Sequence, residues 1–179
     1  MDSGVHYAEY ATTQRPEGRF ATRRLLFIIG YIVIIGGLIG ITVAFIQSMA
    51  FVFGFVFLVL GIALIFFTWR FTKPDYKYVI ETGDIKFSTS YGKRYKENVS
   101  TKIKDAEAIA PYTSEYDEAT KGAAVTYDFR GTTKTPDAYF IVFTKNGKKT
   151  VVLFEGTEKA VGLLYYYNKA TVKREGFAH

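Results

Sequence analysis

Two long runs of apolar residues near the start of the chain are separated by only three residues. The runs are Leu25–Ile46 and Ala50–Trp69, and neither contains a charged residue. As helices rising 1.5 Å per residue, they would be about 33 and 30 Å long, which matches the roughly 30 Å hydrocarbon core of a bilayer. We therefore predict a hairpin of two transmembrane helices, 25–46 and 50–69, within residues 25–69.

A cleavable signal peptide is the alternative explanation for the first run. Signal peptides have an apolar stretch of about 7–15 residues followed by a cleavage site with small residues. The run that begins at Leu25 is longer and leads directly into a second apolar run. The pattern therefore favours a membrane anchor.

Basic residues flank the open end of the predicted hairpin. They are Arg15, Arg19, Arg23 and Arg24 before it, and Arg70, Lys73 and Lys77 after it. The connector at 47–49 has no basic residue. Because loops rich in Lys and Arg stay on the cytoplasmic side, we expect a multi-pass protein of the cell membrane with both termini cytoplasmic. Residues 1–24 would form a cytoplasmic N-terminal segment, in which Tyr7–Thr13 is either an edge strand or disordered.

Small residues recur every seven positions in both predicted helices: Gly30, Gly37 and Ala44 in the first, and Gly54, Gly61 and Thr68 in the second. This spacing predicts that the two helices approach closely along these residues. Gly36 and Gly40 form a second pair, which would suit a further helix from a homo-oligomer or another subunit. Alternatively, this second pair reflects the general abundance of glycine in membrane helices.

The pattern changes from Pro74 onward to an alternation of apolar and polar residues, which is typical of β-strands. Strands are predicted over 76–81, 85–90, 94–100, 104–110, 123–129, 138–144 and 150–154, with loops at 113–122 and 131–136. Asn146-Gly147 predicts a tight β-hairpin turn. Helical periodicity returns over 157–173, with Thr157 as the N-cap. We expect an α+β membrane protein in which residues 74–179 form a small antiparallel barrel or sandwich, closed by this C-terminal helix.

Three segments resemble a known family. Two spans followed by Tyr76-Lys77-Tyr78-Val79-Ile80-Glu81-Thr82-Gly83-Asp84-Ile85-Lys86-Phe87 resemble bacterial membrane-anchored pleckstrin-homology-like (PH-like) proteins. The segments Val152–Lys159 and Tyr7-Ala8-Glu9-Tyr10 are similar to a two-helix subgroup from Gram-positive bacteria. The resemblance implies a PH-like barrel capped by a helix, and it implies no activity.

The amino-acid composition argues against several classes of function. The chain has no cysteine, and its two histidines, His6 and His179, lie near opposite ends. Thiol chemistry, zinc–thiolate sites and multi-histidine metal sites are therefore not expected, and we predict no catalytic residues, metal or cofactor. The net charge is +6, but six basic residues lie directly next to the hairpin (15, 19, 23, 24, 70 and 73), so we do not expect nucleic-acid binding.

Two groups of residues are candidate binding sites. A basic cluster follows the first strand pair and consists of Lys93, Arg94, Lys96, Lys102 and Lys104. It suits an anionic lipid headgroup or a phosphate, or it is a solvated face. Tyr166 is expected to be exposed on the last helix, either as an interface residue or as an ordinary surface tyrosine.

The sequence therefore predicts a non-enzymatic, membrane-tethered binding or scaffold module. Its PH-like domain would bind a protein partner or, as a weaker option, an anionic lipid headgroup. The alternative is an accessory subunit of a larger membrane complex, packed through Gly36 and Gly40. Besides the bilayer, the expected partner is another protein or a second copy of the chain. An enzyme that uses carboxylates alone is a third possibility, disfavoured by the missing nucleophile–base pairs.

Overall fold

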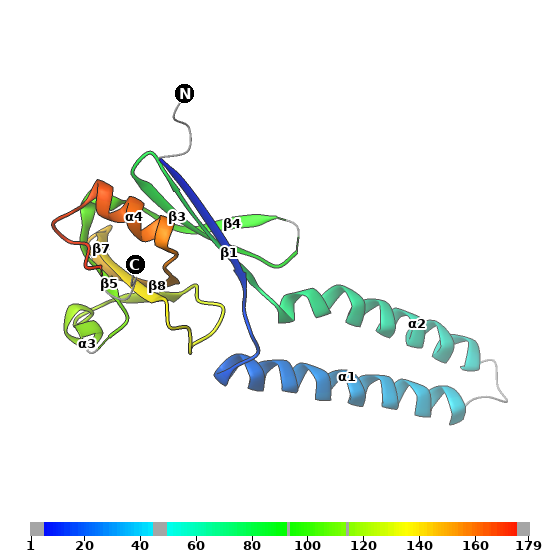
Figure 1. Cartoon of the computed structure of the whole chain (residues 1–179). Helices are drawn as coiled ribbons and strands as arrows, with labels where there is room; N and C mark the ends of the chain where they lie inside the picture. Colours follow the sequence, from blue (N-terminus) through cyan, green and yellow to red (C-terminus); the bar gives the residue numbers. More distant parts are fainter. Residues whose placement is uncertain (1–5, 45–49, 93, 114, 175–179) are drawn as a thin grey trace. The chain divides into compact units, whose positions relative to one another are not determined.

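The hairpin is inserted between two neighbouring strands of one sheet. The computed structural model describes residues 6–44, 50–92, 94–113 and 115–174, in two compact units: Arg15–Pro74, and a β-rich domain that joins the chain up to Gln14 with the chain from Asp75 onward. Strand β1 (Tyr7–Thr13) pairs along its full length with β2 (Asp75–Glu81) (Figure 1). The predicted N-terminal segment 1–24 is therefore not a separate unit. Its part up to Gln14 belongs to the β-rich domain, and its part from Arg15 belongs to the hairpin unit.

The hairpin consists of α1 (Gly18–Ala44) and α2 (Ala50–Trp69), followed by a short 3-10 turn, η1 (Arg70–Thr72). α1 begins earlier than the predicted Leu25, and residues 45–46 of the predicted span lie outside the described residues. Within these helices, Ala21–Ala44 and Phe51–Trp69 are long and apolar enough to cross a membrane. Only 6% and 0% of their most apolar stretches are buried, unlike the core helix of a soluble protein.

The two helices contact each other through glycines on α2 and larger side chains on α1. A methyl group built on Gly54 would lie 2.8 Å from Thr42 Oγ1, and one on Gly61 would lie 2.9 Å from Leu38 Cδ1. Tyr31 and Thr68 share a hydrogen bond of 2.8 Å between their hydroxyls.

Gly30 and Gly37 do not contact α2 as the seven-residue pattern predicted, because a methyl group on either would meet no atom within 4 Å. The α1 contact stripe is rotated by one residue, to Tyr31 and Leu38. The physical reason is that a glycine on one helix leaves a hollow that a larger side chain on the other helix must fill.

The first sheet has the order β1-β2-β3-β4 and is antiparallel throughout. β3 spans Asp84–Ser90 and β4 spans Tyr95–Lys102. β2 and β3 bury alternate side chains, as the sequence pattern predicted. The turn between them uses Thr82 and Gly83, both with positive φ, as a tight hairpin requires.

The second sheet has the order β5-β7-β8-β6. Its strands are β5 (Ala106–Pro111), β6 (Val125–Asp128), β7 (Ala138–Lys145) and β8 (Lys148–Glu155). A 3-10 turn, η2 (Ile103–Asp105), leads into it from β4. The turn Asn146-Gly147 has positive φ at both residues, which confirms the predicted hairpin.

One pair in the second sheet is parallel, so the prediction of a fully antiparallel domain is wrong. β6 runs parallel to β8, with Val125 opposite Thr150. β7 is paired on both sides, with β5 and β8, and β6 lies at the edge of the sheet beside β8. The loop from Phe129 to Asp137 then carries the chain across the end of β8 to the start of β7.

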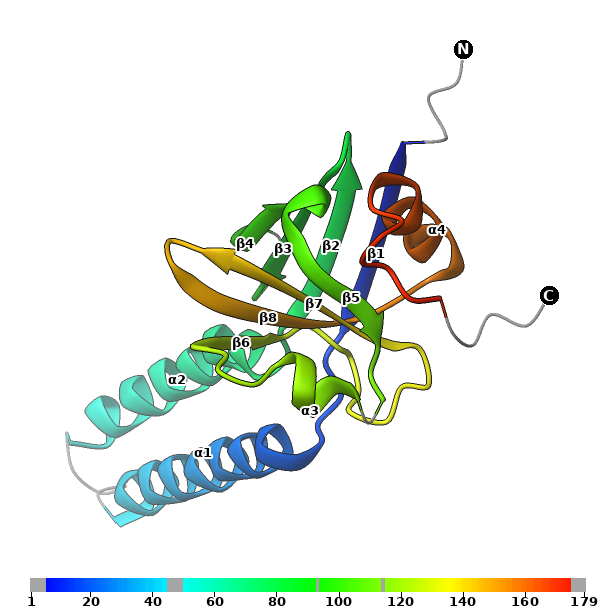
Figure 2. The same cartoon turned by 90° about the vertical axis from the view of Figure 1, so that its left-hand side faces the viewer.

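The main core lies between the two sheets, which cross one another in Figure 2, and the last helix. Phe87 from the first sheet and Phe154 from the second have no exposed surface, and their ring centroids are 5.6 Å apart. The helix α4 (Glu158–Tyr167) buries Ala160, Val161, Leu163 and Leu164. It ends before the predicted limit of 173, because residues 168–174 turn back and Val172 forms a bridge with Ile109 of β5.

A second, smaller apolar cluster covers the outer face of the second sheet. Phe140 and Val142 of β7 pack there with Val151 and Leu153 of β8. The short helix α3 (Glu115–Ala119) lies over them, with the Tyr116 ring edge-on to Phe140. This helix falls within the predicted loop 113–122. With five residues, it is too short to show helical periodicity in the sequence.

Candidate functional site

Strand register sorts the candidate residues into two ends of the first sheet. At one end, Thr13 lies opposite Asp75, Asp75 opposite Ser90, and Ser90 opposite Tyr95. We call this the proximal end, because the chain leaves for the hairpin after Thr13 and returns at Asp75. At the other end, the distal end, Tyr7 lies opposite Glu81 and Asp84 lies opposite Lys102.

The predicted basic cluster is divided between these two ends. Arg94 and Lys96 are exposed at the proximal end, whereas Lys102 and Lys104 are exposed at the distal end. Lys96 and Lys102 are six positions apart along the strand, which is about 20 Å. Lys93 lies outside the described residues. No single ligand headgroup can contact both pairs, so binding by these residues stays a prediction for each end separately.

Tyr166 lies at the distal end with other exposed side chains. It is 57% exposed, and the His6 ring is 5.6 Å from its own ring. His6 Nδ1 lies 2.9 Å from the Tyr167 hydroxyl, and Asn168 donates from Nδ2 to the Ile103 carbonyl at 2.9 Å. These contacts hold the end of α4 against η2 and the start of β1.

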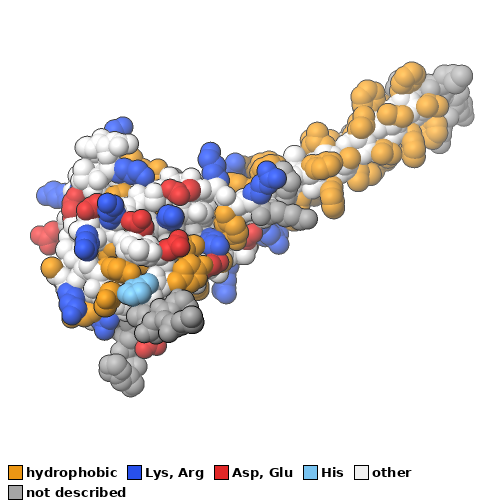
Figure 3. Space-filling model, turned by 90° about the horizontal axis from the view of Figure 1, so that it is seen from above, with side chains coloured by type: hydrophobic (Ala, Val, Ile, Leu, Met, Phe, Trp, Pro, Cys, Tyr) orange, Lys and Arg blue, Asp and Glu red, His pale blue; other side chains and the backbone are white. Residues whose placement is uncertain are grey.

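We name this area the distal surface, defined by His6, Tyr7, Lys102, Lys104 and Tyr166. In the space-filling view, the histidine lies beside hydrophobic side chains, with both basic and acidic groups around them (Figure 3). The distal surface therefore combines aromatic rings, which favour interfaces, with the two exposed lysines Lys102 and Lys104.

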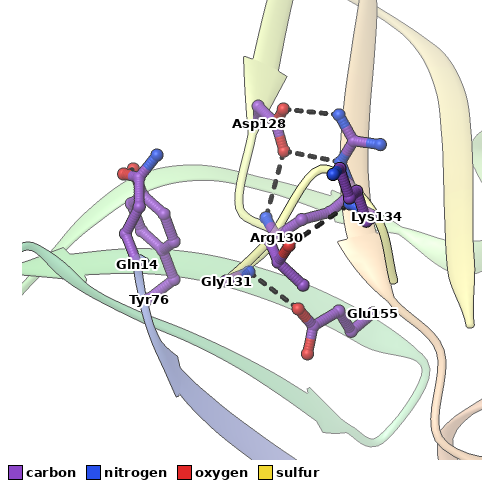
Figure 4. Close-up of polar contacts among 8 residues, drawn as sticks. Gln14, Tyr76, Asp128, Arg130, Gly131, Lys134 and Glu155 are labelled. Carbon is purple, nitrogen blue, oxygen red and sulfur yellow. Dashed lines mark hydrogen bonds and ion pairs between the residues drawn. The ribbon is translucent and has the colours of Figure 1, made fainter. Parts of the chain in front are cut away.

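A buried polar cluster lies at the corner where the two sheets meet (Figure 4). Glu155, at the end of β8, is only 9% exposed. Its carboxylate accepts a hydrogen bond from the Gly131 backbone N–H at 2.7 Å and another from the Tyr10 hydroxyl of β1. The Tyr78 hydroxyl of β2 donates to the Glu155 carbonyl at 2.8 Å. Glu155 thus joins the first sheet, the second sheet and the loop after β6.

A neighbouring ion pair holds the same loop. The Arg130 guanidinium donates from Nε and Nη2 to the two carboxylate oxygens of Asp128, at 2.9 and 2.7 Å. This hydrogen bonding raises the pKa of Arg130 above its ordinary value. The guanidinium also lies 5.0 Å from the centre of the Tyr112 ring. Because the groups of the cluster are paired with one another, the cluster links the two sheets and the loop after β6.

Sequence reasoning missed this cluster. The sequence predicts a loop at Gly131 and a strand that ends just before Glu155, and neither position carries a pattern that indicates a contact between sheets. Among the described residues, no group of three His, Asp or Glu side chains comes together in a way that could hold a metal ion.

Comparison with known protein families identifies the family of this chain. A family model described as Bacterial PH-like domain (DUF6106) matches residues 6–174. The chain belongs to this family. The match begins at β1, crosses the hairpin and ends after α4, so the matched region includes the hairpin. Neither the comparison with curated proteins nor that with solved structures gives a match.

Alkaline pH should destabilise the PH-like domain through its buried tyrosines. Burial and the hydrogen bond to Glu155 raise the pKa of Tyr10 to about 12, and burial also raises the pKa of Tyr76 and Tyr78. A raised tyrosine pKa stabilises the fold below the unfolded value of about 10, and this stabilisation is lost as pH rises through the folded value. The free energy of unfolding should therefore fall between about pH 10 and pH 12.

Denaturant titration of the full-length protein in mild detergent, followed by near-ultraviolet circular dichroism, measures this loss. Tyr10→Phe removes one titrating group, so the variant should lose less stability over the same pH interval. An equal loss in both proteins would mean that Tyr10 does not contribute.

Proposed function

We propose that this chain is a non-enzymatic binding module, anchored by its hairpin in the membrane, whose PH-like domain binds a protein partner on the cytoplasmic side. The pairing of Thr13 with Asp75, on either side of the hairpin, carries this proposal. Only four residues lie between Thr13 and the start of α1 at Gly18, and five lie between the end of α2 at Trp69 and Asp75. These connections span at most about 17 and 21 Å, so the proximal end stays close to the membrane surface.

The same topology supports the predicted orientation. β1 precedes the hairpin and β2 follows it, yet both belong to one domain. The two ends of the hairpin must therefore lie on the same side of the membrane. The basic residues at those ends, among them Arg15, Arg23 and Lys73, favour the cytoplasmic side.

The distal surface is the best candidate for the partner interface. It lies at the opposite end of the first sheet from the two connections, so a soluble protein can reach it. Exposed tyrosines provide large contact area at low entropic cost, and Lys102 and Lys104 would favour an acidic partner.

Affinity purification of the full chain from native membranes tests the interface. A partner should co-purify with the wild type and should be lost with Tyr166→Ser combined with Lys102→Glu. The matched control is Tyr95→Ser with Lys96→Glu, which makes the same changes at the proximal end and should retain the partner. The proposal fails if the wild type elutes alone, or if the distal variant still retains the partner.

An anionic lipid headgroup is the second candidate ligand, and it is favoured at the proximal end. Arg94 and Lys96 are exposed there beside Tyr91 and Tyr95, which are 46% and 45% exposed. Each basic residue near an anionic leaflet contributes about 1 kcal/mol. Amide hydrogen exchange in nanodiscs tests this candidate, since anionic lipid should protect the start of β4 more than zwitterionic lipid does.

Packing in a larger complex remains the alternative function, supported by two open glycines on α1. A methyl group on Gly36 or Gly40 would meet no atom within 4 Å, so this face can accept another helix. Gly36→Leu combined with Gly40→Leu should then reduce the size of the complex on native gels. An unchanged size would argue against this function.

A further inference from the structure

The hairpin contains an apolar groove at its open end, where α1 begins and α2 ends. The groove has a volume of about 500 Å³ and is lined by Arg23, Phe27, Gly30 and Ile34 of α1 and by Leu64 and Thr68 of α2, among other residues. This volume is within the range of about 300–1,000 Å³ that is typical of ligand sites. Gly30 keeps the middle of the groove open, because a methyl group there would meet no atom within 4 Å.

The polar groups of the hairpin near this groove have different roles. Tyr31 and Thr68 are hydrogen bonded to each other across the two helices, and the Arg24 guanidinium lies 5.3 Å from the centre of the Trp69 ring. Arg23 is exposed and lies 5.9 Å from the centre of the Phe27 ring. Among the residues that the structure describes, Arg23 has no carboxylate within ion-pair distance. A positive charge is therefore available at one end of the apolar groove.

The length of the groove matches one leaflet of a bilayer. Arg23 and Ile34 are eleven residues apart on α1, which is about 16 Å along a helix. Half of a hydrocarbon core of about 30 Å is about 15 Å. The groove therefore extends from the level of the headgroups to the middle of the membrane, as a single acyl chain does.

We propose that this groove binds one anionic phospholipid from the leaflet at the open end of the hairpin. Its phosphate pairs with the Arg23 guanidinium, whose planar donors suit phosphate oxygens, and one acyl chain lies along Gly30 between the helices. A second copy of the hairpin would supply no counter-ion for Arg23, because residues 18–74 contain no acidic residue, whereas an anionic lipid supplies charge and chain together. This inference rests on the proposed membrane insertion.

Native mass spectrometry of the full-length protein tests the proposal. The protein is incubated in mild detergent with equal amounts of phosphatidylglycerol and phosphatidylcholine that carry the same chains. The wild type should retain one phosphatidylglycerol in preference by about fivefold, the factor expected for one basic residue at an anionic surface. Arg23→Gln and Gly30→Leu should each abolish the preference, the first by removing the charge and the second by filling the groove.

Two matched variants serve as controls. Arg15→Gln removes a charge close to the start of α1 from a residue that does not line the groove. Gly37→Leu adds a side chain at another open glycine of α1, which also lies outside the groove. Both should keep the preference for phosphatidylglycerol, and far-ultraviolet circular dichroism should show wild-type helix content in all variants. The proposal is overturned if the wild type shows no preference for phosphatidylglycerol, or if Gly30→Leu folds and keeps that preference. It is also overturned if Gly30→Leu converts a dimer to a monomer, because a second copy of the chain would then close the groove.

Extraction of cell membranes with alkaline carbonate separates this proposal from the proposed membrane tether. Release of the protein into the soluble fraction would contradict membrane insertion itself. Resistance to extraction without a preference for phosphatidylglycerol would contradict the lipid site alone.

Discussion

Replacing Glu155 with alanine should lower the free energy of unfolding of the full-length protein by about 2–5 kcal/mol, because two hydrogen-bond donors lose their acceptor. The Gly131 N–H is buried against Glu155, and the Tyr10 hydroxyl shares the same carboxylate. Glu155→Gln keeps the shape but places an amide N–H₂ group where an acceptor is needed, so its cost should be about 1–2 kcal/mol.

Denaturant titration in detergent, followed by near-ultraviolet circular dichroism, measures the effect at position 155. Glu81→Gln is the control, since Glu81 is exposed at the end of β2, and it should change stability by less than about 0.5 kcal/mol. A Glu155→Ala variant that unfolds at the same denaturant concentration as the wild type would show that the corner cluster contributes nothing to stability.

Gly131→Ala should destabilise the domain by about 1–3 kcal/mol, the usual cost of overpacking. The added methyl group would overlap the Thr12 hydroxyl and would lie 3.1 Å from the Thr13 carbonyl oxygen and 3.2 Å from Glu155 Oε1. Two of these neighbours belong to β1, so the variant should also loosen that strand. Faster amide hydrogen exchange over Tyr7–Thr13 than in the wild type would report this loosening directly.

Gly162→Ala is the matched control for Gly131→Ala. Gly162 lies within α4, where a methyl group would be 3.9 Å from its nearest neighbour, on Arg174. Because alanine favours helix over glycine, this variant should gain up to about 1 kcal/mol. If both alanine variants shifted stability in the same direction, the close approach at Gly131 would not be the cause of its effect.

Local sequence patterns identified most of the individual elements. The apolar runs gave the two hairpin helices, and alternation with turn residues gave β2, β3, β7 and β8. These predictions succeed because the length of a helix, the alternation of buried and exposed side chains in a strand and the positive φ of turn residues all depend on neighbouring residues in the sequence.

Contacts between distant residues could not be predicted in the same way. β1 pairs with a strand that begins 62 residues after β1 ends, and the short alternating segment Tyr7–Thr13 does not specify its partner. Alternation predicts the strand β6 but not its parallel direction beside β8. Gly131 and Glu155 meet only because β8 ends at the corner where the loop from β6 passes.

The basic candidates show how an extended strand can mislead a sequence-based prediction. Lys93 to Lys104 are close in sequence, which suggests one cluster even though a strand is predicted over 94–100. In a strand, each residue adds about 3.3 Å, so Lys96 and Lys102 are at opposite ends of β4. The predicted contact face of α1 is wrong for a related reason. A seven-residue spacing of glycines gives the period of a stripe along the helix, but it does not show which stripe contacts α2.

In the proposed function, the hairpin crosses the membrane between two paired strands and holds the PH-like domain on the cytoplasmic side. Because the chain has no cysteine, single cysteines can be placed without background. A membrane-impermeant maleimide applied to intact cells should label Ser48→Cys in the helix connector and should leave Lys148→Cys at the exposed start of β8 unlabelled until the cells are lysed. Labelling of Lys148→Cys in intact cells would contradict this account.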